Sequence, residues 1–418
     1  MGSSAESRVT FFRQSSWMMF ATVAGGVLMW GVHFLAKKIP EAEYSALGTL
    51  LAATILIPTM PLQMVFAQQT AFALATDRRA QLASMIRFAW VGTAVLWFAV
   101  ACVVLVFQGT IVQRWQITNP AAIWATVFVA LGCLWQPLFG GVLQGAQNFL
   151  WLGWANILSG AARLALSVFI VFVLHGYAAG IMTGVMLSLA VPLGIGIWQT
   201  RTLWAVPTAP FDRRQLLEQI IPLMAGFGAF QFFFSADTMF AKAYFSANDV
   251  AYYVAAGVFA RALVWAAGPL ATVMFPKIVH STARAEKTDL MPLTLVCTGL
   301  LVGAGAAVLV IFGPWLVKLV YKSSYVGVTM QILPWYACAM VPLSLMNVLV
   351  NNLLAQARFK VVPWLILLAI CYAIALTRFN KSMVMILQTL IVFSLAALCL
   401  CALFTWRKRP VRQKQETN

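Results

Sequence analysis

Charged residues are scarce in this chain, and acidic residues are the scarcest of them. Asp and Glu number 11 among 418 residues, and all charged types together make up 9%. An average soluble protein has about 25% charged residues. So few charges cannot cover a water-facing surface, which excludes a soluble globular protein. The hydrophobic share of 62% and the mean hydropathy of +0.87 predict a membrane protein instead.

Residues that carry chemistry in enzymes and metal sites are also few. The chain has 3 His, and its 7 Cys lie in or near apolar segments without CxxC or Cys/His spacing. It shows no paired carboxylates and no nucleophile beside a base. We therefore expect no enzyme active site, no metal centre and no cofactor. The cysteines are expected to serve as small packing residues.

Basic residues outnumber acidic ones, for a net charge of +17. They lie in short clusters between apolar runs rather than in a stripe, so nucleic acid is not an expected partner. With the N-terminus placed in the cytoplasm, 18 Lys and Arg residues fall in cytoplasmic segments and 8 on the opposite side. By the positive-inside rule, both termini are predicted to be cytoplasmic.

Long apolar runs occupy most of the chain. A bilayer core of about 30 Å is crossed by about 20 helical residues, and twelve runs reach this length. They predict an all-α polytopic membrane protein with about twelve transmembrane helices. The runs cover roughly residues 15–36, 44–69, 88–107, 121–143, 150–173, 178–198, 219–245, 250–275, 291–312, 327–354, 361–377 and 383–405.

One polar break near the midpoint divides these runs into two sets of six. It contains two prolines and three arginines, which predicts a cytoplasmic linker. PLQMV (Pro61–Val65) and PLATV (Pro269–Val273) lie about half a chain length apart and favour an internal repeat. The predicted parts are an N-terminal six-helix lobe (1–198), a linker (199–218), a C-terminal six-helix lobe (219–405) and a basic cytoplasmic tail (406–418) that would anchor on anionic lipid.

Three charged residues, Arg163, Asp237 and Arg261, fall in the middle of apolar runs. A charge at the bilayer centre costs about 2.5–3.5 kcal/mol on insertion scales, so such residues usually face protein, water or each other. Asp237 and Arg261 flank a short predicted turn at matching depths, within about 3 Å at 1.5 Å per residue. They form either a structural ion pair or part of a substrate site.

The remaining candidates each have two interpretations. Asp237 could bind H⁺ or Na⁺ and couple a gradient to transport, although a nearby Arg lowers a carboxylate pKa and weakens the proton interpretation. Arg163 has no acid at membrane depth in its own half. It is therefore a candidate for meeting an anionic substrate, unless carbonyls or Asp237 cap it. Lys242 either lines the cavity or extends outward to water, and His33 is either a cavity residue or a packing histidine.

Four segments resemble one transporter family. LQGAQNF (Leu143–Phe149) and WANILSGAARLALS (Trp154–Ser167) are similar to its span 4–5 turn. DTMFAKAYFSANDVAYYVAAGVFAR (Asp237–Arg261) and PLATVMFPKI (Pro269–Ile278) are similar to its span 7–8 hairpin. The chain thus resembles the polysaccharide-transporter family, closest to Wzx-like flippases of O-antigen and capsule repeat units. This family belongs to the multidrug/oligosaccharidyl-lipid/polysaccharide exporter superfamily.

The resemblance implies a V-shaped pair of six-helix lobes that flips a polyprenyl-pyrophosphate-linked oligosaccharide to the outer leaflet by alternating access. That function would serve surface polysaccharide and lipopolysaccharide biosynthesis in the bacterial inner membrane, beside a glycan polymerase and a chain-length regulator. The alternatives are a drug or small-molecule exporter of the same superfamily and, less favoured, a membrane glycan polymerase or ligase. Short outer loops and the lack of catalytic groups argue against the last.

Overall fold

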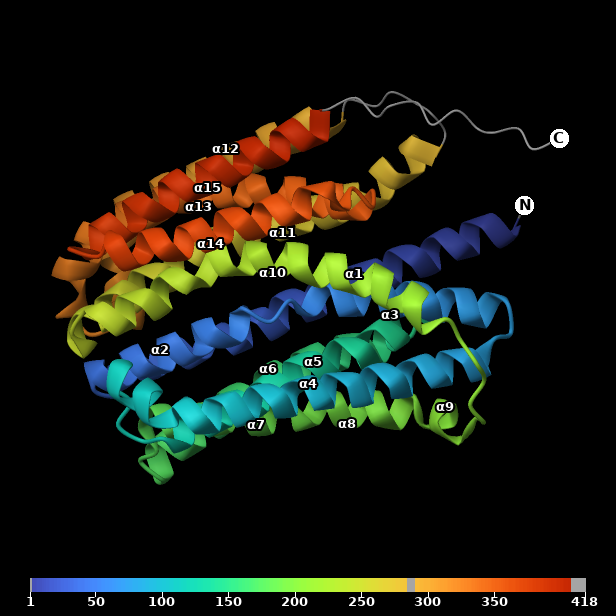
Figure 1. The fold of residues 1–418 in the computed structure, drawn as a ribbon, viewed down its shortest axis with the longest axis horizontal. Coiled ribbons are helices and arrows are strands. Elements are labelled where there is room, and N and C mark those ends of the chain that lie inside the picture. Colours follow the sequence, from blue (N-terminus) through green and yellow to red (C-terminus); the bar gives the residue numbers. More distant parts are fainter. Residues whose placement is uncertain (1, 284–289, 407–418) are drawn as a thin grey trace. The chain divides into compact units, whose positions relative to one another are not determined.

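The fold is all-α. The computed structural model describes residues 2–283 and 290–406, so most of the predicted basic tail lies outside the described residues. The described part contains fifteen α-helices, two 3₁₀ segments and no strand (Figure 1). Twelve helical segments in it are long and apolar enough to cross a membrane. The predicted fold class, a multi-pass membrane protein with twelve spans, is therefore confirmed.

The first six spans contain nine α-helices, because some spans are interrupted or followed by short helices. Their elements are α1 (Gly2–Trp30), η1 (Gly31–Lys37), α2 (Glu41–Ile55), α3 (Thr59–Ala75), α4 (Arg79–Arg114), α5 (Ala121–Gly145), α6 (Phe149–Val173), α7 (Tyr177–Ser188), α8 (Ala190–Gln199) and α9 (Arg201–Ala205).

The last six spans are mostly single uninterrupted helices. Their elements are α10 (Arg213–Tyr244), α11 (Ala247–Ala283), α12 (Leu290–Val320), α13 (Tyr325–Ala355), η2 (Phe359–Val361), α14 (Val362–Arg378) and α15 (Met383–Trp406).

Proline accounts for the clearest interruption. Span 2 ends as α2 at Ile55 and resumes as α3 at Thr59, with Pro58 in an extended conformation between them. Proline has no N–H to donate and clashes with the preceding turn, so a helix tends to stop before it. The amides of Leu56 and Ile57 bond three residues back, to Ala53 and Thr54, which satisfies them inside the membrane.

Glycines allow the helices of the first half to pack backbone against backbone. A Cβ on Gly160 of α6 would lie 2.6 Å from the carbonyl oxygen of Gly25 in α1. On α5, a Cβ at Gly141 would lie 2.6 Å from the carbonyl oxygen of Gln63, and one at Gly145 would lie 2.3 Å from that of Ala67. Small residues replace the hydrophobic effect as the basis of close helix packing in lipid.

The linker between the two halves lies along α4. Within the predicted linker, 199–218, residues 206–212 are not helical. Arg87 of α4 donates to the carbonyl oxygens of Trp204 and Val206, the latter at 3.0 Å, and Ser84 accepts from the amide of Ala209 at 2.9 Å. A basic side chain on α4 thus holds a segment that would otherwise leave its carbonyls unpaired.

The helices group into two compact units. The first comprises residues up to 224 together with 238–255 and 314–329, and the second comprises 225–237, 256–313 and the residues from 330 onward. The ends of α10 to α13 join the first unit because they pack on α2. The division into two six-helix lobes around the linker stays a prediction.

Candidate functional site

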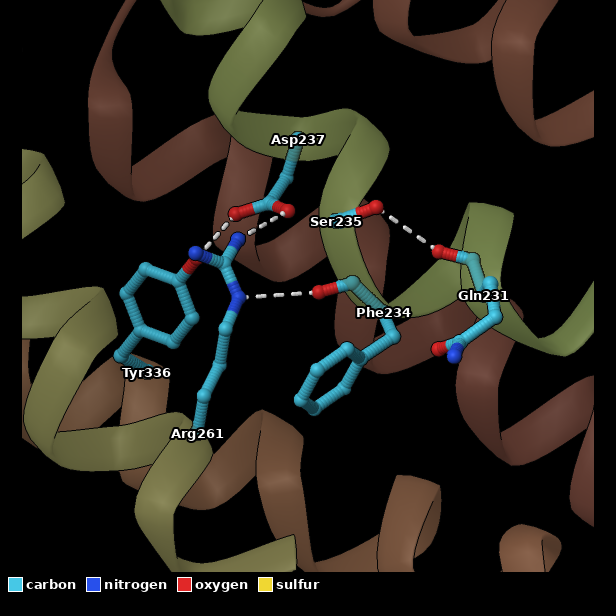
Figure 2. Close-up of polar contacts among 6 residues, drawn as sticks. All are labelled: Gln231, Phe234, Ser235, Asp237, Arg261 and Tyr336. Atoms are coloured by element: carbon cyan, nitrogen blue, oxygen red, sulfur yellow. Dashed lines mark hydrogen bonds and ion pairs between the residues drawn. The ribbon is translucent and has the colours of Figure 1, made fainter. Parts of the chain in front are cut away.

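Asp237 and Arg261 form a buried ion pair in the second unit. Asp237 lies on α10 and Arg261 on α11, and Arg261 Nη2 is 2.8 Å from Asp237 Oδ1 (Figure 2). The two side chains are 0% and 10% exposed, respectively. The structure therefore brings together the two residues that the matching depths predicted to meet.

A third residue completes this cluster. The hydroxyl of Tyr336 on α13 donates to Asp237 Oδ2, so both carboxylate oxygens accept a hydrogen bond (Figure 2). Arg261 also donates through Nε to the carbonyl oxygen of Phe234 at 2.9 Å. The guanidinium carbon lies 5.4 Å from the ring centre of Tyr336 and 5.7 Å from that of Phe234, which adds cation–π attraction.

Both oxygens of the Asp237 carboxylate thus accept from protein donors. A cation such as Na⁺ at this carboxylate would compete with Arg261 and Tyr336 for the same oxygens. Tyr336 was not among the predicted site residues, because a tyrosine inside an apolar run gives no sign that its hydroxyl faces an acid 99 residues earlier.

Arg163 of α6 has a different environment, in the first unit. Its Nε is buried and has no hydrogen-bond acceptor among the described residues, and no described carboxylate lies within ion-pair distance. Its positive charge acts on His33 of η1 and on Cys133 of α5. The prediction that Arg163 finds no acid in its own half agrees with this geometry.

His33 connects the surroundings of Arg163 to a group of tyrosines. Its Nδ1 is 2.9 Å from the hydroxyl of Tyr44 on α2, and the hydroxyl of Tyr44 is 2.7 Å from that of Tyr321. The ring of Tyr321 stacks on that of Tyr325 with centres 5.1 Å apart. His33 is therefore part of a hydrogen-bonded chain and is not an isolated packing residue.

Lys242 lies in the first unit and does not extend to water, which corrects the outward orientation considered for it. Its side chain is fully buried, and Nζ donates to Ser45 Oγ of α2 at 2.6 Å. Glu43 acts on it electrostatically but lies outside ion-pair distance. The physical reason is that α2 covers the end of α10 that carries Lys242. The aliphatic part of the Lys242 side chain therefore packs against protein.

Comparison with known proteins gives a fold and no closer relationship. No protein-family model matches the sequence, and no curated protein matches it. Among solved structures, the chain is similar to an inward-facing multidrug resistance MATE family transporter of the MOP superfamily. The TM-score is 0.71 at 12% identity, over 91% of this chain and 93% of that one.

Two further structures show the same likeness. An outward-facing multidrug resistance MATE family transporter of the MOP superfamily has a TM-score of 0.60 at 11% identity, over 94% and 92% of the two chains. A MATE protein in a straight conformation has a TM-score of 0.61 at 12% identity, over 94% of each. The fold is thus that of these MATE transporters, while the predicted superfamily and its Wzx-like branch stay predictions.

Proposed function

We propose that this protein is a membrane exporter that moves an amphiphilic small molecule by alternating access. The observation that carries the proposal is the likeness of nearly the whole chain to a multidrug resistance MATE family transporter at a TM-score of 0.71. Solved structures of this fold include both inward-facing and outward-facing conformations, which supports a transport cycle between them. The small-molecule alternative is therefore favoured over the oligosaccharide flippase expected from the sequence.

The buried charges favour a substrate with an anionic group. Asp237, the acid at membrane depth, is neutralised by Arg261. Arg163 retains a buried donor without an acceptor among the described residues, and Lys242 has a hydroxyl as its closest partner. Because the excess charge is positive, an organic cation would be repelled and an organic anion attracted.

Arg163 is the residue we propose to contact the substrate. A guanidinium stays charged in a low-dielectric environment and can donate to two oxygens of a carboxylate, sulfonate or phosphate at once. Such a group would supply the acceptor that Nε lacks within the described part of the chain. Asp237 stays the candidate for H⁺ or Na⁺ coupling, and its carboxylate oxygens accept from Arg261 and Tyr336.

Efflux from proteoliposomes tests this proposal. Vesicles containing the protein should export carboxyfluorescein, an amphiphilic anion, faster than they export ethidium, a cation. Arg163→Leu should lower carboxyfluorescein export about ten- to a hundredfold, since hydrogen bonds to charged groups contribute about 1.5–3 kcal/mol. Arg163→Lys should retain part of it. Preferred export of ethidium, or full export by Arg163→Leu, would contradict the proposal.

A second candidate is the flippase for polyprenyl-pyrophosphate-linked oligosaccharide. The same buried donor of Arg163 favours it, because pyrophosphate is an anion that matches a guanidinium. Its test is the transfer of a fluorescent polyprenyl-pyrophosphate disaccharide between leaflets of the same vesicles. Transfer of this lipid without carboxyfluorescein export would favour the flippase over the small-molecule exporter.

A further inference from the structure

One end of the first unit holds α2 against residues from the second half of the chain. This end is where α2 begins, and the charge distribution predicts that it faces away from the cytoplasm. Two chain reversals contribute, one between α10 and α11 and one between α12 and α13. The contacts join three residues of α2 to three distant partners, which together we term the outer latch: Tyr44 with Tyr321, Ser45 with Lys242, and Gly48 with Val254.

Two of the three latch contacts are single hydrogen bonds between buried polar groups. The hydroxyls of Tyr44 and Tyr321 are 2.7 Å apart, and both side chains are less than 2% exposed. Lys242 Nζ is 2.6 Å from Ser45 Oγ, and Ser45 in turn donates to the carbonyl oxygen of Ala42 at 2.7 Å. Each of these groups would find water as a partner if the contact opened, so separation leaves nothing unsatisfied.

The third contact is steric. Gly48 has no side chain, and a Cβ built on it would lie 2.2 Å from Cγ1 of Val254 on α11. The backbone of α2 at Gly48 therefore packs directly against the side chain of Val254 on α11. A lysine outside the latch adds a further contact at the same end, because Lys322 donates to the carbonyl oxygen of Ile39 at 3.1 Å and lies 3.7 Å from Glu41.

The latch differs from the glycine contacts within the first half. Gly160 lies against the backbone of Gly25, and Gly141 and Gly145 lie against the backbones of Gln63 and Ala67, so opening those contacts would break backbone packing. Hydrogen bonds such as that from Gln63 to Gln144 lie beside them. The latch instead combines hydroxyls, one ammonium group and one close glycine contact. Separating it costs hydrogen bonds that water replaces, which is the property of an interface that opens and closes repeatedly.

We propose that the outer latch keeps this end of α2 closed and that its opening is the step that releases substrate. This inference rests on the proposed transport function. The latch also connects to the end of span 1, because the hydroxyl of Tyr44 is 2.9 Å from His33 Nδ1.

A reversible cross-link tests the latch. In a variant whose 7 native cysteines are replaced by Ala, Gly48→Cys and Val254→Cys would place two Cβ atoms 3.0 Å apart in the present geometry. Disulfides span about 3.5–4.5 Å between Cβ atoms, so a small shift suffices. Oxidation should reduce carboxyfluorescein export to the level of empty vesicles, and dithiothreitol should restore it.

A matched pair inside the first half serves as the control. A Cβ on Gly132 of α5 would lie 3.3 Å from the Cβ of Leu189, so Gly132→Cys with Leu189→Cys should cross-link equally well. Because both residues belong to the first half, this disulfide should leave export unchanged. Full export by oxidised, cross-linked Gly48→Cys/Val254→Cys would overturn the proposal.

A second measurement needs no transport substrate and so separates failure of the latch from failure of the proposed function. Thr49 is 1% exposed and lies one turn beyond Ser45 on α2. A Thr49→Cys reporter should react slowly with a membrane-impermeant maleimide, and Lys242→Met with Tyr321→Phe should accelerate this labelling several-fold. Tyr336→Phe, in the second unit, should not. Unchanged labelling in a double variant that still elutes as folded protein would overturn the latch even if export is confirmed.

Discussion

The hydroxyl groups of Tyr44 and Tyr321 lie 2.7 Å apart although 277 residues separate them in the chain. Tyr321 lies in the turn after α12, and burial raises the pKa of its hydroxyl well above the ordinary value of 10.0. The hydrogen bond between Tyr321 and Tyr44 opposes that shift without cancelling it. Tyr321 therefore stays protonated through the physiological range, and this bond does not change with pH. Any pH dependence of transport must come from other groups.

Removing one partner of the Asp237–Arg261 pair should destabilise the protein more than replacing both partners with apolar residues. Asp237→Leu removes the carboxylate that the buried Arg261 bonds and should lower the free energy of unfolding by about 3–5 kcal/mol. Asp237→Leu with Arg261→Met removes both charges at similar volume and should restore most of the loss. Thermal unfolding in detergent provides the measurement. Additive losses in the double variant would show that the two residues do not depend on each other.

Replacement of Arg163 by an apolar residue should stabilise the fold and impair transport. Its buried Nε lacks an acceptor among the described residues, and an unsatisfied buried donor costs about 1–3 kcal/mol. Arg163→Leu should therefore raise the melting temperature while it reduces export of an anionic substrate. Carboxyfluorescein should in turn stabilise the native protein and not the Leu variant, measured by thermal shift. A destabilised Arg163→Leu would indicate a structural role instead.

Gly48 should be the most sensitive position of the outer latch. Gly48→Leu would drive a side chain into Val254 and separate α2 from α11, since atoms cannot approach within 3.0 Å. The Thr49→Cys reporter should then label several-fold faster from the outside. Gly92→Leu is the control, because a Cβ at Gly92 meets nothing within 4 Å. Equal labelling in the two variants would contradict the close approach of α2 and α11.

The packing of α1 on α6 should tolerate no side chain at Gly160. A Cβ there would lie 2.6 Å from the carbonyl oxygen of Gly25, a backbone atom that cannot rotate away. Gly160→Val should therefore cost about 1–3 kcal/mol through overpacking, seen as a lower melting temperature. Gly194→Val, where a Cβ meets nothing within 4 Å, should change stability much less. Similar melting temperatures for both would argue against backbone contact between these helices.

Part of the candidate site could be predicted from the sequence. The pairing of Asp237 with Arg261 follows from depth, because two residues at equal distances from a helical turn lie side by side. The isolation of Arg163 follows from counting acids at membrane depth. Tyr336 and Ser45 could not be found in this way, because the rotation of each helix about its axis decides which partner a side chain meets. The sequence does not show which way a hydroxyl in an apolar run is directed.

Composition and the lengths of the apolar runs determined that this protein spans a membrane twelve times, because a bilayer permits only helices of about that length and hydrophobicity. Because charge is scarce, each charge inside an apolar run also stands out in the sequence itself. Only the tertiary structure decided that Tyr336 joins the Asp237–Arg261 pair. It also showed that Lys242 is buried against α2 and that Tyr44, Tyr321 and Gly48 belong to one latch. Those contacts depend on how helices far apart in the chain pack together, and the spacing of residues in the sequence does not indicate this packing.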